Sequence, residues 1–374
     1  MIDINLISVG YVGRLLDPDS KEVARMKEYA AHFTTFTMVV FTRTHQRLPE
    51  RYQDGNLTII GTNTRTRIGS FIQAIVLLRQ TMAQLGKGTQ IVVTTQDPFK
   101  TTLVARLGLP RQLPLVVQVH GDYFSKTKEA VRGLWRWYGR RQLIKASMVR
   151  VVSKRIKDSL VGIGVPAERI KVLPIFFAVD THLNIGEVRQ YADIGPVKWL
   201  FVGRLAPEKN IPLLIKSVKT AVDGGLDVSL TIVGDGPLRG QLERMVERMG
   251  LANHILFTGW QEDVSANFTS ADVFVLSSDH EGWGMVLIEA MAAGLPMVVT
   301  DVGCVGEAVV DQQQALVARV GDDTGFMELC KKLSADAELR RTLGINGHKR
   351  AREITLTPSE YVKKWVEVMQ KAVR

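Results

Sequence analysis

Residues 276–307 read LSSDHEGWGMVLIEAMAAGLPMVVTDVGCVGE, and this stretch decides the fold. The apolar run that leads into it, residues 273–276, predicts a strand that ends in a short polar turn. A glycine-rich corner follows, and then a helical run over residues 285–293 that stops before Gly294, a residue typical of the position after a helix. Residues 297–300 predict the next buried strand. The stretch is therefore one βαβ unit of a parallel sheet, and such units bind ligands at the carboxyl ends of their strands.

Two glutamates, Glu281 and Glu289, flank the corner. Because a helix rises about 1.5 Å per residue, Glu289 lies roughly 12 Å along the axis from the start of the helix. Glycoside hydrolases hold their two carboxyl groups about 5 Å apart when retaining and about 6.5 to 9.5 Å apart when inverting. The spacing therefore speaks against a hydrolytic pair and favours two carboxylates that bind different hydroxyls of one elongated ligand. The amides of residues 282–286, at a helix N-terminus, would bind an anion between them.

The corner resembles the donor-site signature of the retaining glycosyltransferases of family four, the glycosyl transferases group 1, which have the GT-B fold. The shared pattern is a glutamate, seven residues and a second glutamate, set in an EG-aromatic-G corner before EAMAAGLP. Trp283 stands where the family usually has phenylalanine. The resemblance implies an α/β protein with two Rossmann-like, doubly wound parallel-sheet domains that face each other across a cleft. It also implies a C-terminal helix that crosses back to the first domain.

Length and composition agree with two globular domains. The chain has 374 residues, 45% of them hydrophobic and 23% charged. Its two cysteines, Cys304 and Cys330, lack a paired spacing, which excludes a cysteine-based metal cluster and suggests a reducing compartment. We expect no signal peptide and no transmembrane segment, and hence a soluble or peripheral protein.

Positive charge is concentrated in the first half of the chain. Residues 1–178 hold 27 Lys and Arg against 12 Asp and Glu, whereas residues 179–374 hold 21 against 26. The net charges are therefore +15 and −5. This asymmetry suggests that the first domain faces an anionic surface or substrate, although a chance distribution of surface charge would also produce it.

Strand and helix patterns alternate along the chain, as in a doubly wound parallel sheet. In the first half, strands are predicted over residues 2–9, 37–41, 57–60, 91–94, 115–119 and 148–152, and helices over 21–32, 70–85 and 126–145. In the second half, strands are predicted over residues 199–202, 228–233, 255–257, 273–276 and 297–300. We expect an acceptor- and membrane-facing domain at residues 1–178, joined by the cross-over helix at 358–374, and a donor domain at 179–357. The apolar-poor residues 177–197 would form the hinge.

Two loops of the first half carry candidate ligand contacts. Gly10 and Gly13 follow the first strand and permit close approach to a phosphate, although an ordinary turn would also explain them. Family members carry a donor-facing glycine loop at this place. His120 directly follows the strand over 115–119, and the matching histidine of the family lies against the donor sugar. The alternative for His120 is a simple pairing with Asp122, whose use as a base only an inverting enzyme would need.

A predicted helix of the first half is basic and aromatic. Its candidate membrane or acceptor residues are Lys128, Arg132, Arg136 and Arg140 at i, i+4 spacing, with Trp135, Trp137 and Arg141 beside them. Like charges at this spacing cost about 0.2 to 0.5 kcal/mol per pair, which an external anion would offset. Basic and aromatic side chains suit the headgroup layer of an anionic membrane. The alternative is a solvated helix with Trp135 in the core.

The loop GRLAPEK follows the first strand of the second half. Gly203 leaves space there, and Arg204 and Lys209 bring two cations that could compensate the charge on a diphosphate leaving group. The loop matches the family's GR…EK motif. A salt bridge to Glu208 is the alternative for Lys209.

Further donor contacts follow from the resemblance. Gly234 opens a GDGP turn of the donor domain, in which Arg239 breaks the dinucleotide fingerprint. Gly259 and Trp260 lie where the family seats the nucleotide base, and Trp260 could either stack on that base or simply pack. The resemblance assigns the sugar to Glu281, the ribose to Glu289, and the remaining contacts to the corner residues Gly282, Trp283, Gly284, Met285 and Val286.

The sequence as a whole therefore predicts a glycosyltransferase of the hexosyl type that acts with retention of configuration. His120, Glu281, Arg204 and Lys209 are its candidate catalytic residues. We expect a nucleotide-sugar donor, most simply a UDP-sugar, and a lipid-linked or polysaccharide-precursor acceptor in envelope glycan assembly. We expect no cofactor, no metal and no nucleic acid, and a cytoplasmic location on the inner face of the membrane. A non-hydrolysing nucleotide-sugar epimerase of the same fold and a catalytically silent nucleotide-sugar-binding subunit remain alternatives.

Overall fold

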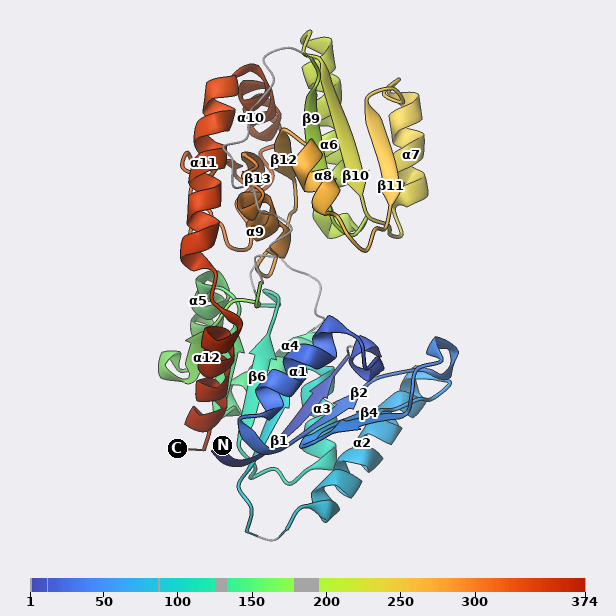
Figure 1. Ribbon diagram of the computed structural model, residues 1–374, viewed down its shortest axis with the longest axis vertical. Helices are drawn as coiled ribbons and strands as arrows, with labels where there is room; N and C mark the ends of the chain where they lie inside the picture. The colour runs from blue at the N-terminus through green and yellow to red at the C-terminus, as the bar shows by residue number, and fades with distance from the viewer. Residues whose placement is uncertain (1, 12, 87, 125–132, 178–194, 374) are drawn as a thin grey trace. The chain divides into compact units, whose positions relative to one another are not determined.

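The protein divides into two compact units, as the computed structural model in Figure 1 shows. The structure describes residues 2–11, 13–86, 88–124, 133–177 and 195–373. Unit 1 comprises Met1–Pro174 and Pro358–Arg374, and unit 2 comprises Ile175–Thr357. The division after Pro174 lies four residues before the expected boundary, and most of the predicted hinge falls outside the described residues.

Unit 1 contains an eight-stranded sheet in the order β3-β4-β2-β1-β5-β6-β7-β8. Its strands are β1 Ile2–Gly10, β2 Phe33–Val40, β3 Arg51–Asp54, β4 Leu57–Gly61, β5 Ile91–Thr95, β6 Leu115–Val119, β7 Met148–Val151 and β8 Ile170–Val172. Its α-helices are α1 Lys21–Ala30, α2 Arg67–Gln84, α3 Lys100–Gly108, α4 Gly133–Lys145, α5 Lys154–Gly162 and α12 Pro358–Lys371. Shorter 3-10 turns are η1 Gly13–Leu16, η2 Thr44–Gln46 and η3 Ala167–Arg169.

Unit 2 contains a six-stranded sheet in the order β11-β10-β9-β12-β13-β14, with parallel pairing throughout. Its strands are β9 Val197–Val202, β10 Val228–Val233, β11 Ile255–Gly259, β12 Val273–Leu276, β13 Met297–Thr300 and β14 Ala315–Ala318. Its helices are η5 Pro207–Lys209, α6 Ile211–Asp223, α7 Arg239–Arg248, α8 Ser265–Ser270, α9 Met285–Ala292, α10 Asp323–Ala335 and α11 Ala337–Ile354.

Central strands follow the predictions because both of their faces are buried. Ile4, Leu6, Ile7 and Val9 of β1 are at most 1% exposed, as expected for a parallel strand covered on both sides. The predicted parallel sheet of unit 1 nevertheless needs one correction at its edge. There β3 pairs antiparallel with β4, and its sequence, RYQD, lacks the apolar run that marks a buried strand.

The handedness of the crossovers places the helices of unit 1 in two layers. The connections from β4 through β8 all move in one direction across the sheet, whereas the connection from β1 to β2 moves in the other. Because such connections are right-handed, α2, α3, α4 and α5 cover one face and α1 covers the opposite face. No described helix has the length and apolar content needed to cross a bilayer.

Helix α12 packs on unit 1 through aromatic contacts. The Trp365 ring stacks on Tyr29 at 4.6 Å and meets the rings of Phe33 and Phe36 at 6.1 and 6.2 Å. These contacts explain why β2 begins at Phe33 rather than at residue 37, since the residues that bury its first half are distant in sequence.

A buried arginine also fastens α12 to this sheet. Arg150 of β7 donates to the carbonyls of Leu173 and Pro174 at 3.1 and 2.7 Å, to Gln118 at 2.9 Å and to the Tyr361 hydroxyl at 2.7 Å. Tyr361 in turn donates to the Pro174 carbonyl at 2.9 Å. One guanidinium therefore binds both the segment that leaves unit 1 and the helix that returns to it.

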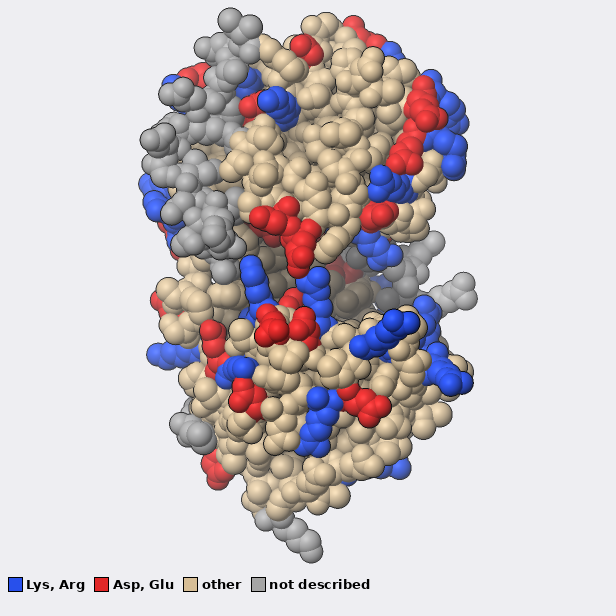
Figure 2. Space-filling view, turned by 45° about the vertical axis from the view of Figure 1, so that its right-hand side comes forward, with Lys and Arg blue, Asp and Glu red and all other residues tan. Residues whose placement is uncertain are grey.

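Basic residues gather at one edge of unit 1. Figure 2 shows Lys and Arg along the right-hand edge of this unit. Between residues 43 and 67 the chain carries five arginines and two carboxylates. The arginines are Arg43, Arg47, Arg51, Arg65 and Arg67, and all but the half-buried Arg43 are exposed.

Candidate functional site

The glycine-rich corner connects β12 to α9, as predicted. Gly284 caps α9 with a φ of 80°, in the left-handed region that favours glycine. Gly284 has no side chain to cap the helix, and the first-turn amides of Met285 and Val286 have no hydrogen-bond partner among the described residues. The open amides of a helix N-terminus bind anions, so this end of α9 can hold one.

The loop after β13 packs against the glycine-rich corner. The Cys304 amide donates to the Trp283 carbonyl at 2.8 Å. A Cβ atom on Gly303 would lie 2.5 Å from that carbonyl and 2.9 Å from the Cβ of Glu281. Trp283 is itself only 7% exposed, so its side chain packs in unit 2, and any ligand contact of this residue involves its backbone.

Glu289 lies one turn further along α9 and is half-buried. Its carboxyl group has no hydrogen-bond or ion-pair partner among the described residues. Burial raises its pKa above the ordinary value because the charged form loses hydration without gaining a partner. Unpaired acids of this kind are typical of ligand-binding positions.

Lys209 and Glu281 form an ion pair at 2.5 Å, with side chains that are 17% and 12% exposed. The Ser278 hydroxyl donates to the same Glu281 oxygen at 2.9 Å. The alternative pairing of Lys209 with Glu208 is therefore wrong, because the partner is 72 positions away. The sequence suggested that the Lys209 ammonium is an independent cation for a phosphate. In the structure, Glu281 neutralises the charge of this ammonium.

Arg204 is the cation of this loop that remains available. Its side chain is exposed and makes no hydrogen bond or ion pair with any residue that the structure describes. It lies immediately after Gly203, at the carboxyl edge of β9. This edge is where parallel sheets bind ligands.

Three predicted donor glycines lie at the carboxyl ends of adjacent strands. The Gly203 amide donates to the Val233 carbonyl at 3.0 Å, and the Gly234 amide donates to the Gly259 carbonyl at 2.8 Å. Gly234 has a φ of 135°, and a Cβ atom there would overlap the Gly203 carbonyl. The Gly203 backbone therefore fills the space on the Cβ side of Gly234, and a contact of Gly234 with the donor stays a prediction.

Trp260 follows β11 and is 65% exposed. The alternative that it simply packs is therefore wrong. Gly259 before it has a φ of 78°, and a Cβ atom there would lie 3.2 Å from Nη1 of Arg239. The turn presents the indole to solvent, where a planar base can stack on it.

The two glycines of the first loop pack against side chains of unit 1. A Cβ atom on Gly10 would lie 3.2 Å from Gln96, and one on Gly13 would lie 2.9 Å from Leu48. These contacts explain the absence of side chains at both positions without a ligand. Packing against these side chains is compatible with an ordinary turn, and a donor contact of this loop stays a prediction.

His120 lies at the carboxyl end of β6 and pairs with Gln96 at 2.9 Å. Burial and the nearby charge of Arg150 lower its pKa to about 3, so the imidazole is neutral at neutral pH. The alternative pairing with Asp122 is wrong. Asp122 accepts instead from the Ser159 hydroxyl at 2.9 Å and from the Phe124 amide at 3.3 Å.

The basic helix is confirmed as α4 from Gly133, whereas Lys128 and Arg132 lie outside the described residues. Arg136 donates to the Phe124 carbonyl and Arg140 to the Ile163 carbonyl, each at 2.7 Å. These two guanidinium groups therefore bind neutral carbonyl oxygens of the protein, and an external anion as the partner of the helix's charge stays a prediction.

The two tryptophan side chains of α4 are exposed to solvent. Trp135 is 45% exposed and Trp137 is 57% exposed, so the alternative that buries Trp135 in the core is wrong. Arg141 lies over the Trp137 ring at 5.7 Å.

Two family models match the chain in succession. One, described as "Glycosyl transferases group 1", matches residues 191–350, and the other, described as "Glycosyl transferase 4-like domain", matches residues 25–175. The chain belongs to the group 1 glycosyl transferases.

Among curated relatives of this group 1 glycosyl transferase, alpha-D-kanosaminyltransferase from Streptomyces kanamyceticus is 28% identical over 250 residues. The match covers 63% of this chain and 64% of that relative, which is less than two thirds of its length.

Two solved structures show the same fold. Sucrose-phosphate synthase from Thermosynechococcus elongatus superposes with a TM-score of 0.77 at 19% identity and covers 98% of both chains. HepE from Anabaena, solved in complex with UDP-glucose, gives a TM-score of 0.73 at 17% identity and covers 98% of this chain and 99% of its own. The fold of this group 1 glycosyl transferase is therefore GT-B.

Two polar residues at strand ends escaped the sequence analysis of this glycosyl transferase. Ser278 binds Glu281, and Gln96 binds His120. Both follow a predicted strand at its carboxyl end, and that position was the signal that could have identified them.

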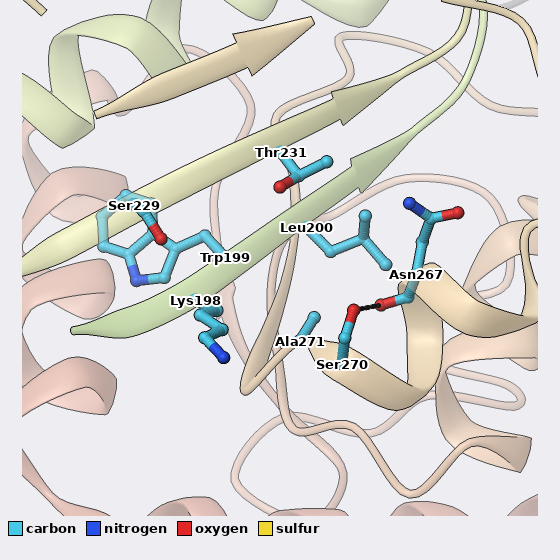
Figure 3. A pocket seen from close by; sticks show the side chains of 8 residues that line it. All are labelled: Lys198, Trp199, Leu200, Ser229, Thr231, Asn267, Ser270 and Ala271. Carbon is cyan, nitrogen blue, oxygen red and sulfur yellow. Dashed lines mark hydrogen bonds between the residues drawn. The ribbon is translucent and has the colours of Figure 1, made fainter. Parts of the chain in front are cut away.

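A hollow of about 240 Å³ lies elsewhere in unit 2. Figure 3 shows its lining side chains from β9, β10 and the segment around α8, among them Lys198, Thr231 and Asn267. It lies beside the first half of β9, whereas Gly203 and the corner lie at the carboxyl ends of the strands. We therefore do not assign the hollow to the candidate site of this glycosyl transferase.

Proposed function

We propose that this protein transfers a sugar from a nucleotide-sugar donor to a hydroxyl group of an acceptor. The observation that carries this proposal is the pair of open groups on α9. Within the part of the chain that the structure describes, Glu289 offers a half-buried carboxylate without a partner, and the first turn offers amides without a partner. A ligand with hydroxyls next to a diphosphate satisfies both at once.

The donor would bind along the carboxyl edge of the unit 2 sheet. Glu289 would accept hydrogen bonds from the ribose hydroxyls, as acidic residues do in dinucleotide folds. Arg204 and the α9 amides would compensate the diphosphate charge, and Trp260 would stack on the base. Glu281, held by Lys209 and Ser278, keeps a second carboxylate oxygen for the sugar. His120 in unit 1 remains a predicted ligand of the sugar.

The reaction would retain the configuration at the anomeric carbon. The bond between that carbon and the diphosphate oxygen breaks, and a bond to the acceptor oxygen forms on the same face. The acceptor proton passes to an oxygen of the leaving diphosphate, so no protein base is needed. Arg204 and the amides stabilise the departing charge, and we propose that the transfer requires no metal.

Uridine diphosphate is the nucleotide that we propose. HepE from Anabaena, which has the same fold, was solved with UDP-glucose. The exposed indole of Trp260 would accept a uracil ring by stacking.

A panel of UDP-, GDP- and ADP-sugars tests the proposal. We expect one UDP-sugar to raise the melting temperature and to release UDP in the presence of an acceptor mixture. Arg204→Ala should lower the transfer rate about 10²- to 10³-fold and leave the melting temperature unchanged, because the side chain is exposed. Arg341→Ala, an exposed arginine of the same unit, is the matched control. Absence of protection by every donor would refute the proposal.

We also propose that unit 1 binds an anionic membrane surface through the layer of α2, α3, α4 and α5, which would place the enzyme on the inner face of the membrane in envelope glycan assembly. These four helices carry eleven Lys and Arg and one acidic residue. Their exposed apolar side chains include Ile68, Ile72, Trp135 and Trp137. A basic surface with exposed aromatic and aliphatic groups suits an anionic headgroup layer.

Vesicle sedimentation tests the membrane proposal. We expect binding to vesicles that contain phosphatidylglycerol, and we expect it to weaken with salt because the attraction is electrostatic. Replacement of Ile68 and Trp137 by serine should reduce this binding, while Leu256→Ser, an exposed apolar residue of unit 2, should not. Equal binding to neutral phosphatidylcholine vesicles would contradict the proposal.

A further inference from the structure

Three side chains, two from loops and one from the first residue of α3, meet at the carboxyl edge of the unit 1 sheet. The ring of Tyr11, just after β1, stacks on the ring of Phe41, just after β2, with centroids 5.4 Å apart. The Lys100 ammonium lies 4.5 Å from the Phe41 centroid and 5.8 Å from the Tyr11 centroid. Tyr11 is 45% exposed. The cluster therefore combines an accessible aromatic surface with a cation beside it.

The nearby carboxylate of Asp97 is already engaged. One oxygen accepts from the Tyr11 hydroxyl at 2.7 Å and from the Thr101 hydroxyl at 2.9 Å, and the other accepts from the Phe99 amide at 2.7 Å. Asp97 therefore fixes the Tyr11 ring and binds residues at the start of α3. Lys100 has no hydrogen-bond or ion-pair partner in the part of the chain that the structure describes.

The position of Lys100 is unfavourable for a cation. It is the first residue of α3, where the helix dipole repels positive charge. Burial lowers the pKa of its ammonium, and the charges of Arg43 and Arg67 lower it further, whereas Asp97 opposes them. Three cations against one carboxylate leave this cluster with a net positive charge. Such an arrangement is typical of a site whose missing partner is an anionic ligand.

Further arginines add positive charge around Lys100. The charges of Arg43 and Arg67 act on the Lys100 ammonium, and Arg47 and Arg65 lie in the same segment of the chain. These residues would attract an anionic molecule to the aromatic surface and would not retain a neutral one.

We propose that Tyr11, Phe41 and Lys100 form the acceptor subsite, and that the acceptor is a carbohydrate ring that bears a phosphate or a carboxylate. The C–H face of the ring lies on Tyr11, and the anion contacts Lys100. This inference rests on the proposed function, because it names the acceptor class of the same transfer.

The anion that we assign to Tyr11, Phe41 and Lys100 is not the diphosphate of the donor. Unit 2 contains its own groups for that charge, Arg204 and the open amides of α9. The aromatic pair would add nothing to a diphosphate, whereas it suits the apolar face of a sugar ring. The combination of ring and cation therefore selects an anionic sugar.

Calorimetric binding to the full-length protein tests the inference with matched pairs of probes. The pairs are glucose with glucose 6-phosphate, glucose with glucuronate, and N-acetylglucosamine with its 6-phosphate. We expect at least one anionic member to bind about tenfold or more tightly than its neutral partner, as a charged hydrogen bond provides. Vesicles of phosphatidylglycerol and of phosphatidylcholine form a separate arm that distinguishes a lipid-borne phosphate from a soluble one.

Lys100→Met removes the charge but keeps the length of the side chain. We expect this variant to lose the preference for the anionic probe, and Lys100→Arg to retain it. Lys27→Met is the matched control, because Lys27 also lies over a tyrosine ring, at 5.7 Å from that of Tyr52, but pairs with Asp54. The control should bind every probe as the wild type does. Circular dichroism establishes that each variant is folded.

Two results would overturn the inference. One is a wild-type protein that binds no anionic probe more tightly than its neutral partner. The other is a Lys100→Met variant that is folded and keeps the wild-type preference. UDP binding, measured on the same samples, reports on the proposed donor site alone, so a failure of the proposed function is recognised separately.

Discussion

At the scale of single residues, the ionised carboxylate of Glu289 lowers the free energy of unfolding. Its carboxyl group is half-buried without a partner among the described residues, and burial raises its pKa. Between the unfolded and the folded pKa, the folded protein binds more protons than the unfolded chain. The free energy of unfolding therefore falls as the pH rises through this window, and the deficit persists at neutral pH.

Glu289→Gln should consequently stabilise the protein while it removes donor binding. We expect a higher melting temperature than the wild type at pH 7 to 8, and a difference that vanishes below the ordinary pKa of glutamate, about 4.3. Thermal protection by the donor should be lost because the amide is a poorer acceptor for ribose hydroxyls. Calorimetric melting across this pH range measures both effects. A variant that is less stable than the wild type at pH 7 to 8 would contradict this account.

The Lys209–Glu281 pair should behave as a unit. Both side chains are mostly buried, and removal of one partner of a buried pair costs about 3 to 5 kcal/mol. We expect Lys209→Met to lower the free energy of unfolding by an amount of this order, and the double variant Lys209→Met with Glu281→Gln to recover much of it. Urea unfolding of the single and double variants measures the coupling.

The exposed pair Lys219–Asp223 provides the control for this experiment. Its side chains are 39% and 57% exposed, and exposed pairs contribute about 1 kcal/mol or less. Lys219→Met should therefore have little effect. Equal losses from Lys209→Met and Lys219→Met would show that the Glu281 ion pair contributes no special stability.

At the scale of elements, the loops after β9 and β10 support each other through their glycines. Gly234→Ala should displace the loop that carries Arg204, because the new Cβ atom would overlap the Gly203 carbonyl. Gly225→Ala is the control, since Gly225 has a φ of 80° but nothing within 4 Å of an added Cβ. In the control, the free energy of unfolding should fall only by the cost of a left-handed backbone at a non-glycine residue, about 1 to 2 kcal/mol. The donor should still protect this variant against heat. Melting curves with and without donor distinguish the two, and equal effects would contradict the overlap.

Sequence patterns predict those elements whose signal is local. The ranges expected for β6, β10, β12 and β13 agree with the structure, because β6, β12 and β13 are short runs buried on both faces and β10 alternates apolar with polar residues. The strands β3, β8 and β14 were missed, and each of them lies at the edge of its sheet, where fewer strand contacts mark the sequence.

The residues of the candidate site likewise fall into those that local sequence predicts and those that it does not. Position at a strand end identified Arg204, His120 and the corner. The ion pair of Lys209 with Glu281 spans 72 positions, and the fixing of Tyr11 by Asp97 spans 86. Neither partner can be read from local spacing, because tertiary packing alone brings these residues together.

At the scale of the molecule, the hydrogen bonds of Arg150 hold the C-terminal helix α12 against the rest of unit 1. Tyr361→Phe removes one acceptor of this guanidinium and the donor to the Pro174 carbonyl. Because the hydrogen bond involves a buried charge, we expect a loss of about 1.5 to 3 kcal/mol. Hydrogen exchange should accelerate in β7 and α12 and remain unchanged in unit 2. A uniform acceleration over both units would contradict the assignment of α12 to unit 1 alone.

The same connectivity has a consequence for biosynthesis. Unit 2 is encoded between Pro174 and Pro358, so the ribosome makes all of it before Tyr361 and Trp365 emerge. At translation rates of about 5 to 20 residues per second, the nascent amino-terminal sheet would wait on the order of 10 to 40 s for its final helix. Throughout that interval Arg150 and the aromatic face of β2 lack the partners that cover them in the finished protein, and they are the natural place for a chaperone to bind the growing chain.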